Sequence, residues 1–201
     1  MKLYYAQATC SHAVHIALRE AELPFTLVRY DMKRATLDDG GSLLAINEKG
    51  FVPVLELDSG ERLTEVPAVL QYVADQAPGK HLAPPYGTLA RYRLMEWLNF
   101  LGTEVHKIYW PLFHDGEPVE NDKARDKLAR SFTYVEQRLG AQPYLMGEQF
   151  TIADAYLVTV LNWTRAAGID LGRWPGLAAY RKRVRERPAV AAALDAEGLR
   201  R

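Results

Sequence analysis

The sequence predicts two domains, an α/β domain followed by an all-helical one, and three observations lead to this prediction. Strand-like and helix-like patterns alternate over residues 1–80, which is typical of a sheet covered by helices. Proline and glycine then interrupt the chain at 77–79 and 83–87. Only helical spacing follows. We therefore expect an α/β domain over 1–80 and an all-α helical bundle over 88–201.

Turn and cap residues mark the ends of the expected elements. The strands of the first domain are expected at 3–5, 25–30, 54–57 and 62–64, and its helices at 13–22 and 66–77. The helices of the second domain are expected at 88–109, 122–139, 151–167, 176–186 and 188–194. Gly140 and Gly168 predict helix ends, and Thr151 with Asp154 predicts a capping box that opens the helix 151–167.

The charges of the chain balance, with 25 Lys and Arg against 25 Asp and Glu among 201 residues. A chain without net charge has no overall field to attract nucleic acid or an acidic membrane surface, so we expect a small substrate. No apolar run reaches the roughly 18 residues of a membrane helix, and no basic start precedes an apolar segment. We therefore expect an unprocessed cytoplasmic protein.

Cys10 is the single cysteine, at a turn between a strand and a helix that opens near Ser11. Backbone N–H groups at a helix start favour a thiolate over a thiol, which makes Cys10 a candidate reactive group. The alternative is a small buried hydrophobe. An internal disulfide is excluded, so any thiol that resolves an oxidised Cys10 must come from outside the chain.

Two further segments of the first domain are candidates for ligand binding. Pro53 opens a strand after a turn-rich stretch, a position where proline needs no special purpose. Glu65 lies at a helix start, where the helix dipole alone favours a carboxylate. The functional alternative is that Glu65 holds a ligand ammonium while the Val66 N–H holds a carboxylate.

A polar stripe runs along the expected helix 88–109, where Asn99, Thr103 and His106 are four and three residues apart. Such a stripe is often just a solvated face; the alternative is that it lines a ligand pocket. His12 and His15 follow Cys10 at a spacing that suggests a metal site, but no fourth ligand is apparent and one helix turn does not direct all three inward. We expect no metal.

Together these segments resemble the cytosolic glutathione S-transferases, and the bacterial beta class in particular. The resemblance spans the whole chain, and the segments that carry it are Met1–Tyr5 running to Cys10, Ala45–Pro53, Leu63–Glu65, Asn99–Lys107 and Phe150–Asp154. It implies a thioredoxin-like N-terminal domain that binds glutathione, followed by the helical domain. It also implies a homodimer.

The resemblance implies a role for each matching residue of the first domain. Val52, preceding a cis Pro53, pairs its backbone with the cysteinyl residue of glutathione. Glu65 binds the γ-glutamyl ammonium and the Val66 N–H its carboxylate. The hydroxyl residue or glycine common after the acidic residue is replaced by Val66-Pro67, so we expect weaker binding of glutathione. Ala35 stands where the family has a lysine, and Lys33 or Arg34 is the expected substitute for contact with the glycyl carboxylate.

The resemblance also places Cys10 opposite the glutathione sulfur, where it either forms a mixed disulfide or helps to hold the thiolate. His106 is then a hydrogen-bond donor or proton shuttle near neutral pH. The other residues expected to contribute to this pocket are Asn99, Thr103, Glu104, Val105 and Lys107. The aromatic residues expected to form its walls are Tyr109, Trp110, Phe113 and Trp163.

The predicted function is conjugation of the glutathione thiol to small hydrophobic electrophiles, with glutathione as co-substrate and with thiol–disulfide exchange through Cys10 as a further capacity. One alternative is a glutathione-dependent reductase or dehalogenase that makes and breaks a disulfide between Cys10 and glutathione. The other is a non-catalytic binding scaffold of the same fold. Retention of Cys10, Val52-Pro53, Glu65 and His106 favours an enzyme.

Overall fold

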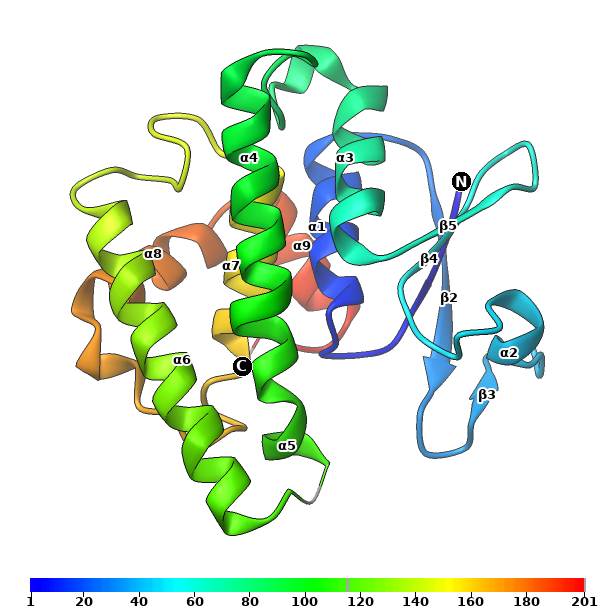
Figure 1. The fold of residues 1–201 in the computed structure, drawn as a ribbon. Coiled ribbons are helices and arrows are strands. Elements are labelled where there is room, and N and C mark those ends of the chain that lie inside the picture. The colour runs from blue at the N-terminus through cyan, green and yellow to red at the C-terminus, as the bar shows by residue number, and fades with distance from the viewer. Residues whose placement is uncertain (115, 201) are drawn as a thin grey trace. The chain divides into compact units, whose positions relative to one another are not determined.

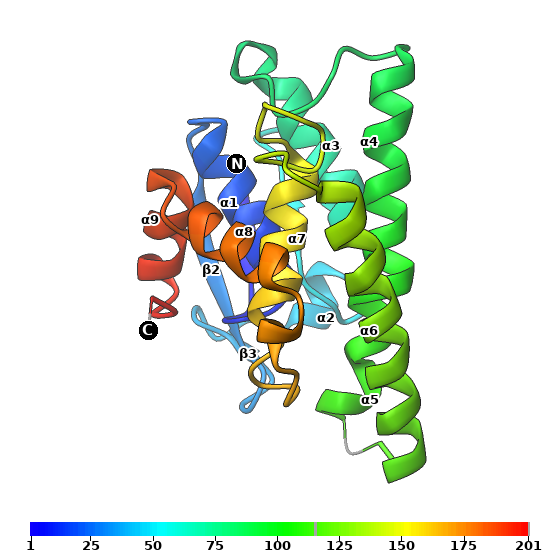
Figure 2. The ribbon, with the colours of Figure 1, turned by 90° about the vertical axis from the view of Figure 1, so that its left-hand side faces the viewer.

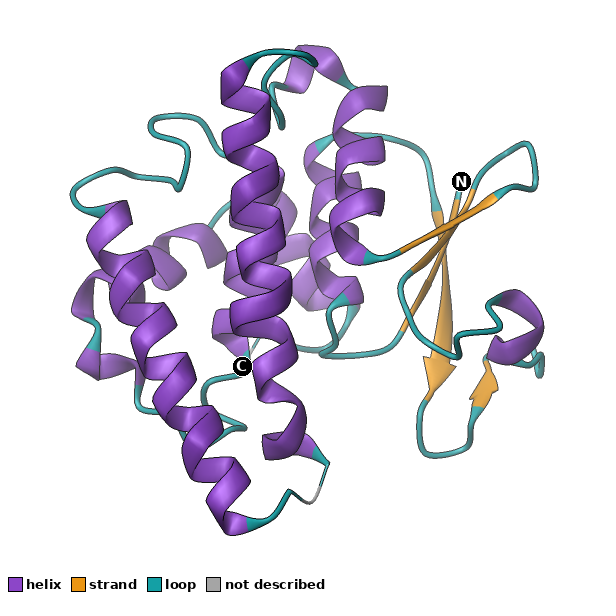
Figure 3. Cartoon of the chain, in the orientation of Figure 1, coloured by secondary structure: helices purple, strands orange, loops and turns teal. Residues whose placement is uncertain are grey.

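The computed structural model describes residues 1–114 and 116–200, which form two compact units. The first unit contains Met1–Ala83 together with Pro188–Arg201, and the second contains Pro84–Arg187. Within the part of the chain that the structure describes, every strand belongs to the first unit, and the second is built of helices and loops (Figure 3). The predicted order, α/β first and helical second, is confirmed.

The first unit contains a mixed five-stranded sheet in the order β3-β2-β1-β4-β5. The strands are β1 (Lys2–Tyr5), β2 (Thr26–Asp31), β3 (Thr36–Leu37), β4 (Val54–Glu56) and β5 (Arg62–Thr64). β1 and β2 are parallel and the other neighbours antiparallel, as in a thioredoxin-like domain. The predicted hairpin is confirmed, with Val54 opposite Thr64 and Glu56 opposite Arg62. This pairing brings the start of β4 beside the end of β5.

Helices cover both faces of the sheet. The helices of this unit are α1 (Ser11–Glu20), α2 (Leu43–Ile46), α3 (Val66–Gln76), the 3₁₀ turn η1 (Pro78–Lys80) and α9 (Pro188–Ala196). Figure 1 shows α1 and α3 together on one side of the sheet and α2 on the other. Residues 11–18 of α1 are all buried, because α3 and α9 both pack against α1.

The final helix departs from the predicted domain 88–201, since α9 lies in the first unit. Val190 and Leu194 of α9 are buried, and the helix packs on α1. Directly after it, the carboxylate of Glu197 lies 2.8 Å from Nδ1 of both His12 and His15. An apolar helix face shows that a helix packs but not against which partner, so this assignment required the tertiary structure.

The second unit is organised around a buried helix. Its helices are α4 (Leu89–Phe100), α5 (Trp110–Phe113), α6 (Pro118–Leu139), α7 (Ile152–Asn162), the 3₁₀ turn η4 (Leu171–Arg173) and α8 (Pro175–Arg185). α7 is buried over nearly its whole length and contacts α4 and α8 (Figure 2). The predicted capping box opens α7, where the Asp154 carboxylate accepts from the Thr151 N–H at 2.8 Å.

The predicted helix 88–109 is not one regular α-helix. α4 ends at Phe100, a π-helical segment η2 (Leu101–His106) follows, and a 3₁₀ turn η3 (Lys107–Tyr109) leads into α5. A π-helical turn holds more residues than an α-helical turn, so the side chains beyond it rotate relative to those before it. The single polar face of Asn99, Thr103 and His106 was predicted from α-helical spacing, which the π-helical segment changes between Leu101 and His106. π-helical segments occur frequently at functional sites.

In the described ranges 1–114 and 116–200, we find no helix with the length and apolar character needed to span a bilayer.

Candidate functional site

The first unit brings two of the predicted segments into contact. Cys10 is the residue before α1, and its Sγ donates a hydrogen bond to the Val52 carbonyl oxygen at 3.4 Å. The peptide bond between Val52 and Pro53 is cis, as the resemblance implies. A thiol that donates carries its proton. The Cys10 thiol and the Val52 carbonyl are thus in contact although 42 positions separate the two residues in the sequence.

The environment of Cys10 contradicts the expected thiolate. Burial is the largest influence and raises the pKa of the thiol to about 12, while the N–H groups of Cys10 and Ser11 at the helix start lower it. The negative charge of Glu65 raises the pKa further. The helix start favours a thiolate as expected, but desolvation of the charged form outweighs the backbone N–H groups and favours the thiol.

Alkylation of Cys10 tests this protonation state directly. Because only the thiolate reacts and its pKa is about 12, the rate with iodoacetamide is expected to rise about tenfold per pH unit from pH 7 to pH 10 without a plateau. Intact mass reports the reaction without ambiguity, since Cys10 is the single cysteine. Cys10→Ser serves as the blank, and N-acetylcysteine as an exposed-thiol reference. A plateau below pH 9 would contradict the prediction.

Glu65 stands at the junction of β5 and α3 in a strained conformation. Its φ of 68° lies where side-chain-bearing residues are rare, and such strain concentrates at ligand sites. The side chain is exposed, and Oε1 accepts a hydrogen bond from Lys49 Nζ at 2.6 Å. The same ammonium donates to Thr64 Oγ1 at 2.7 Å. The effect of Glu65 on the pKa of Cys10 shows that its charge acts on the thiol.

Val66 follows with its side chain buried, so that only its backbone can serve a ligand. The first N–H groups of a helix have no partner within the helix, and Val66 provides one of them at the start of α3. Pro67 provides none. The helix start therefore presents a backbone donor next to the Glu65 carboxylate.

Arg34 lies in the turn between β2 and β3, away from these contacts. Its backbone N–H donates to Asp31 Oδ1 at 3.2 Å, and its guanidinium Nε lies 3.8 Å from Asp31 Oδ2. Backbone hydrogen bonds from Arg34 and Lys33 lower the pKa of Asp31. Within residues 1–114 and 116–200, no hydrogen bond or ion pair links Arg34 to Cys10, Val52 or Glu65. Its predicted contact with glutathione stays a prediction.

The second unit contains His106 at the end of η2. Its Nδ1 lies 2.7 Å from the hydroxyl of the buried Tyr156 on α7. Its ring also meets that of Trp163 edge-on, with centroids 5.0 Å apart. These contacts hold the imidazole in one orientation, as a general acid or base requires.

The neighbours of His106 separate into exposed and buried groups. Asn99, Thr103, Glu104 and Lys107 are exposed, and the Thr103 hydroxyl donates to the Asn99 carbonyl at 3.1 Å. Lys107 lies over the ring of Trp110, with 5.2 Å between Nζ and the centroid. Val105 is fully buried in the core of the unit. Because its side chain has no free surface, only its backbone can contact a substrate, and its predicted role stays a prediction.

The predicted aromatic walls are mostly one packed cluster. Trp163 meets Tyr109 at 5.3 Å and Phe113 at 6.1 Å, measured between ring centroids. Tyr109 is buried, whereas Phe113 and Trp110 are partly exposed. Phe113 and Trp110 are therefore the aromatic residues of this group with most surface to offer an apolar ligand. Burial raises the pKa of the Tyr109 phenol, which excludes a phenolate there.

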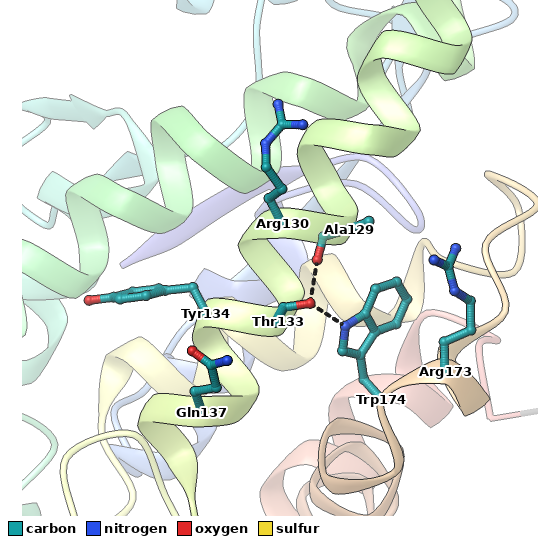
Figure 4. A pocket seen from close by; sticks show the side chains of 7 residues that line it. All are labelled: Ala129, Arg130, Thr133, Tyr134, Gln137, Arg173 and Trp174. Carbon is teal, nitrogen blue, oxygen red and sulfur yellow. Dashed lines mark hydrogen bonds between the residues drawn. The ribbon is translucent and has the colours of Figure 1, made fainter.

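A separate open hollow of about 470 Å³ lies on the second unit and contains none of the predicted site residues. The residues that line it are Ala129, Arg130, Thr133, Tyr134, Gln137, Arg173 and Trp174 (Figure 4). The Thr133 hydroxyl donates to the Ala129 carbonyl and accepts from the Trp174 indole, each at 2.9 Å. These contacts provide partners for the Thr133 hydroxyl and the Trp174 indole within the chain itself.

Sequence reasoning missed Lys49 and Glu197. Lys49 lies inside the matching segment 45–53, where its charge beside a predicted ligand loop was the available signal. Glu197 joins His12 and His15 in a buried group whose ligand atoms lie within 4.8 Å of one another. Burial opposes the charge of Glu197, but hydrogen bonds from the two histidines outweigh it and lower the pKa of the carboxyl.

This buried group has a hydrogen-bonding role that disfavours a metal. Arg19 Nε donates to His15 Nε2 at 2.8 Å, so His15 Nδ1 carries a proton and donates to Glu197. Burial lowers the pKa of His15 and keeps it neutral. An imidazole nitrogen that carries a proton is not a metal ligand. The hydrogen bonds of His12 and His15 to Glu197 therefore connect α1 to the segment after α9, and the arrangement favours this structural role over a cation site.

Known protein families match the two parts of this chain separately. The N-terminal domain model of glutathione S-transferases matches residues 9–76, and the C-terminal domain model matches residues 88–188. Glutathione S-transferase GstA of Escherichia coli O157:H7 is 44% identical over 201 residues, covering 100% of both chains.

Solved structures agree over the full length. The chain matches a ternary complex of BphK, a bacterial glutathione transferase, with a TM-score of 0.97, 47% identity and coverage of 99% of this chain and 100% of that chain. A bacterial beta class glutathione S-transferase from Sphingomonas chungbukensis gives a TM-score of 0.95 and 43% identity, with the same coverage. The chain belongs to the glutathione S-transferase family and resembles its bacterial beta class.

Proposed function

We propose that this protein conjugates the thiol of glutathione to small hydrophobic electrophiles. The observation that carries the proposal is the hydrogen bond between the Cys10 thiol and the Val52 carbonyl. The Cys10 thiol also lies close enough to Glu65 for the charge of the Glu65 carboxylate to raise its pKa. Within the family, residues at these positions hold the tripeptide. Structures similar to this chain include a sphingomonad glutathione S-transferase complexed with glutathione, at 42% identity.

Each group of the first unit has a distinct part in this proposal. The Val52 backbone pairs with the cysteinyl residue of glutathione, Glu65 binds the γ-glutamyl ammonium, and the Val66 N–H binds its carboxylate. When glutathione takes the Val52 carbonyl, the Cys10 thiol loses its present acceptor. It then donates to the glutathione sulfur, which stabilises the thiolate that attacks the electrophile.

The protonation of Cys10 favours conjugation over thiol exchange. Exchange requires Cys10 itself as the attacking thiolate, and a pKa of about 12 leaves that form scarce at neutral pH. A protonated Cys10 can still stabilise a neighbouring thiolate by donating to it. Conjugation therefore requires Cys10 only in its protonated form, which the raised pKa favours.

The second unit contributes residues whose roles are proposed from the resemblance. His106 acts as a hydrogen-bond donor or proton shuttle, with Asn99, Thr103, Glu104 and Lys107 around the ligand. Phe113 and Trp110 offer apolar surface to the electrophile. We further propose a homodimer in the cytoplasm without a metal, and light scattering of the purified protein tests the dimer.

The proposal is tested by measuring glutathione conjugation to a generic aryl halide with wild type and Cys10→Ala. We expect conjugation by wild type and a loss of about 2- to 12-fold in kcat/KM for Cys10→Ala. This is the range for an ordinary hydrogen bond, because a thiol is a weak donor even to a charged acceptor. Cys10→Ser, which retains a donor, is expected to lose less.

Intact mass after incubation with oxidised glutathione separates the other functions. A glutathione adduct that depends on Cys10, together with little conjugation, would replace this proposal with thiol–disulfide exchange. Absence of both binding and activity at millimolar glutathione would replace it with a binding scaffold.

A further inference from the structure

The ammonium of Lys49 joins two segments of the first unit that the proposed function assigns to glutathione. Lys49 lies in the loop after α2, three residues before Val52, and donates to Thr64 Oγ1 at 2.7 Å and to Glu65 Oε1 at 2.6 Å. These acceptors lie 15 and 16 positions further along the chain. Lys49 is therefore a side-chain link between the loop that carries Val52 and the helix start that carries Glu65.

The loop around Lys49 is itself held in place. Asn47 is buried, and its side-chain Nδ2 donates to the Phe51 carbonyl at 2.8 Å. The oxygen of the same side chain accepts from the Lys49 N–H at 3.3 Å. The backbone of Lys49 is thus fixed from within its own loop, and its side chain extends from a defined origin to Glu65.

The ion pair between Lys49 and Glu65 contributes little to the folding stability of the protein. The side chains of Lys49 and Glu65 are 46% and 68% exposed. An exposed pair of this kind contributes roughly 0–1 kcal/mol to folding. The same interaction acts on the orientation of Glu65, because a long, exposed carboxylate side chain otherwise samples several rotamers.

The pair also leaves half of the carboxylate available. Glu65 Oε1 is engaged by Lys49, while Oε2 has no hydrogen bond to any residue that the structure describes. A carboxylate accepts at both oxygens, so a second ammonium can bind on the Oε2 side without displacing Lys49. The geometry favours Lys49 as a support for Glu65 over Lys49 as a competitor of the ligand.

We propose that Lys49 is a positioning residue that presents the Glu65 carboxylate to the γ-glutamyl ammonium of glutathione. This inference rests on the proposed function and adds a residue to it. Without Lys49, binding must itself immobilise the Glu65 side chain, which is expected to raise KM and Kd for glutathione about 2- to 5-fold, within the free energy of the exposed pair. The turnover number at saturating glutathione is expected to stay unchanged, since Lys49 touches neither sulfur nor electrophile in this scheme.

The test compares wild type with Lys49→Met, which keeps the side-chain length and removes the charge. Lys49→Arg is expected to restore binding, because a guanidinium can donate to the same two acceptors. Lys80→Met is the matched control, since Lys80 is also half-exposed and paired with a carboxylate, Glu22, elsewhere in the same unit. Thermal unfolding of each variant is expected to match that of wild type.

A second ligand isolates the path through Glu65. Calorimetric titration with glutathione is repeated with the analogue whose γ-glutamyl amino group is replaced by hydrogen. Wild type and Lys49→Met are expected to bind this analogue equally, because it has no ammonium for Glu65 to hold.

Three results would overturn the inference. Tighter binding of glutathione by Lys49→Met would show that Lys49 competes with the ligand ammonium. Unchanged binding would show that Lys49 has no role in binding. An equal loss of affinity for the analogue would show that Lys49 acts on the carboxylates of the ligand and not through Glu65. Absence of glutathione binding by wild type would instead reject the proposed function, so the two failures are distinguishable.

Discussion

Replacing Glu65 with alanine is expected to weaken glutathione binding by about 10- to 150-fold, the range that corresponds to loss of one hydrogen bond to a charged group. The carboxylate is the proposed partner of the γ-glutamyl ammonium, and Val66 offers only a backbone N–H beside it. Because Val66 has no hydroxyl, no side-chain donor at this position can compensate for the loss of Glu65. Titration calorimetry with glutathione, and the KM for glutathione in conjugation, measure the effect.

The expected loss is specific to binding, because the Glu65 side chain is exposed and supports no buried contact. Unfolding in urea should therefore leave the variant within about 1 kcal/mol of wild type, as for other exposed ion pairs. Glu61→Ala provides the matched control, since Glu61 is an exposed carboxylate of the same hairpin. Glutathione binding that survives in Glu65→Ala would show that the ammonium is held elsewhere.

Replacing Asp154 with alanine is expected to lower the free energy of unfolding by about 3–5 kcal/mol, the usual effect of removing one member of a buried charged network. Asp154 is fully buried and accepts from the N–H groups of Thr151 and Leu145 at 2.8 and 2.9 Å. The Tyr180 hydroxyl also donates to it, at 2.8 Å. Truncation leaves these buried donors without an acceptor. Urea unfolding followed by circular dichroism measures the loss.

The control for this prediction is Asp170→Ala. Asp170 also accepts from a backbone N–H at a helix start, that of Gly172 at 2.8 Å, but the contact is exposed. Its loss should cost about 1 kcal/mol, as for ordinary helix caps. Equal effects of the two substitutions would show that the wider network around Asp154 adds nothing to a simple cap. We assign Asp154 no part in catalysis.

Local sequence signals were sufficient for the parts of the site that lie at the ends of short elements. Cys10 follows a strand and precedes a helix, and Glu65 stands between a hairpin and a helix, so turn chemistry alone locates both. The raised pKa of Cys10 opposes the thiolate that the helix start predicts. A helix start is visible in sequence, whereas desolvation depends on what surrounds the sulfur after folding.

The helix that carries the polar stripe shows a different limit. Apolar spacing predicted a helix there correctly, yet it could not distinguish an α-helix from the π-helical segment that begins at Leu101. The two forms differ by one residue in the hydrogen-bonded turn, and side-chain periodicity over six residues does not resolve that difference. Val105 was placed with the ligand-binding residues by the resemblance, and the structure buries its side chain in the core.

The sequence by itself determined the order of the two domains, the hairpin, the capping box and the candidate residues Cys10, Glu65 and His106, because these depend on neighbours within a few positions. Val52 was identified through the resemblance to the family. Only the tertiary structure decided that Lys49 reaches Glu65, that α9 packs on α1, and that Glu197 meets His12 and His15 across more than 180 positions. The physical reason is that turns, caps and amphipathic faces are local properties of a chain. The choice of a partner for a charged or apolar side chain is made by packing, which no local pattern records.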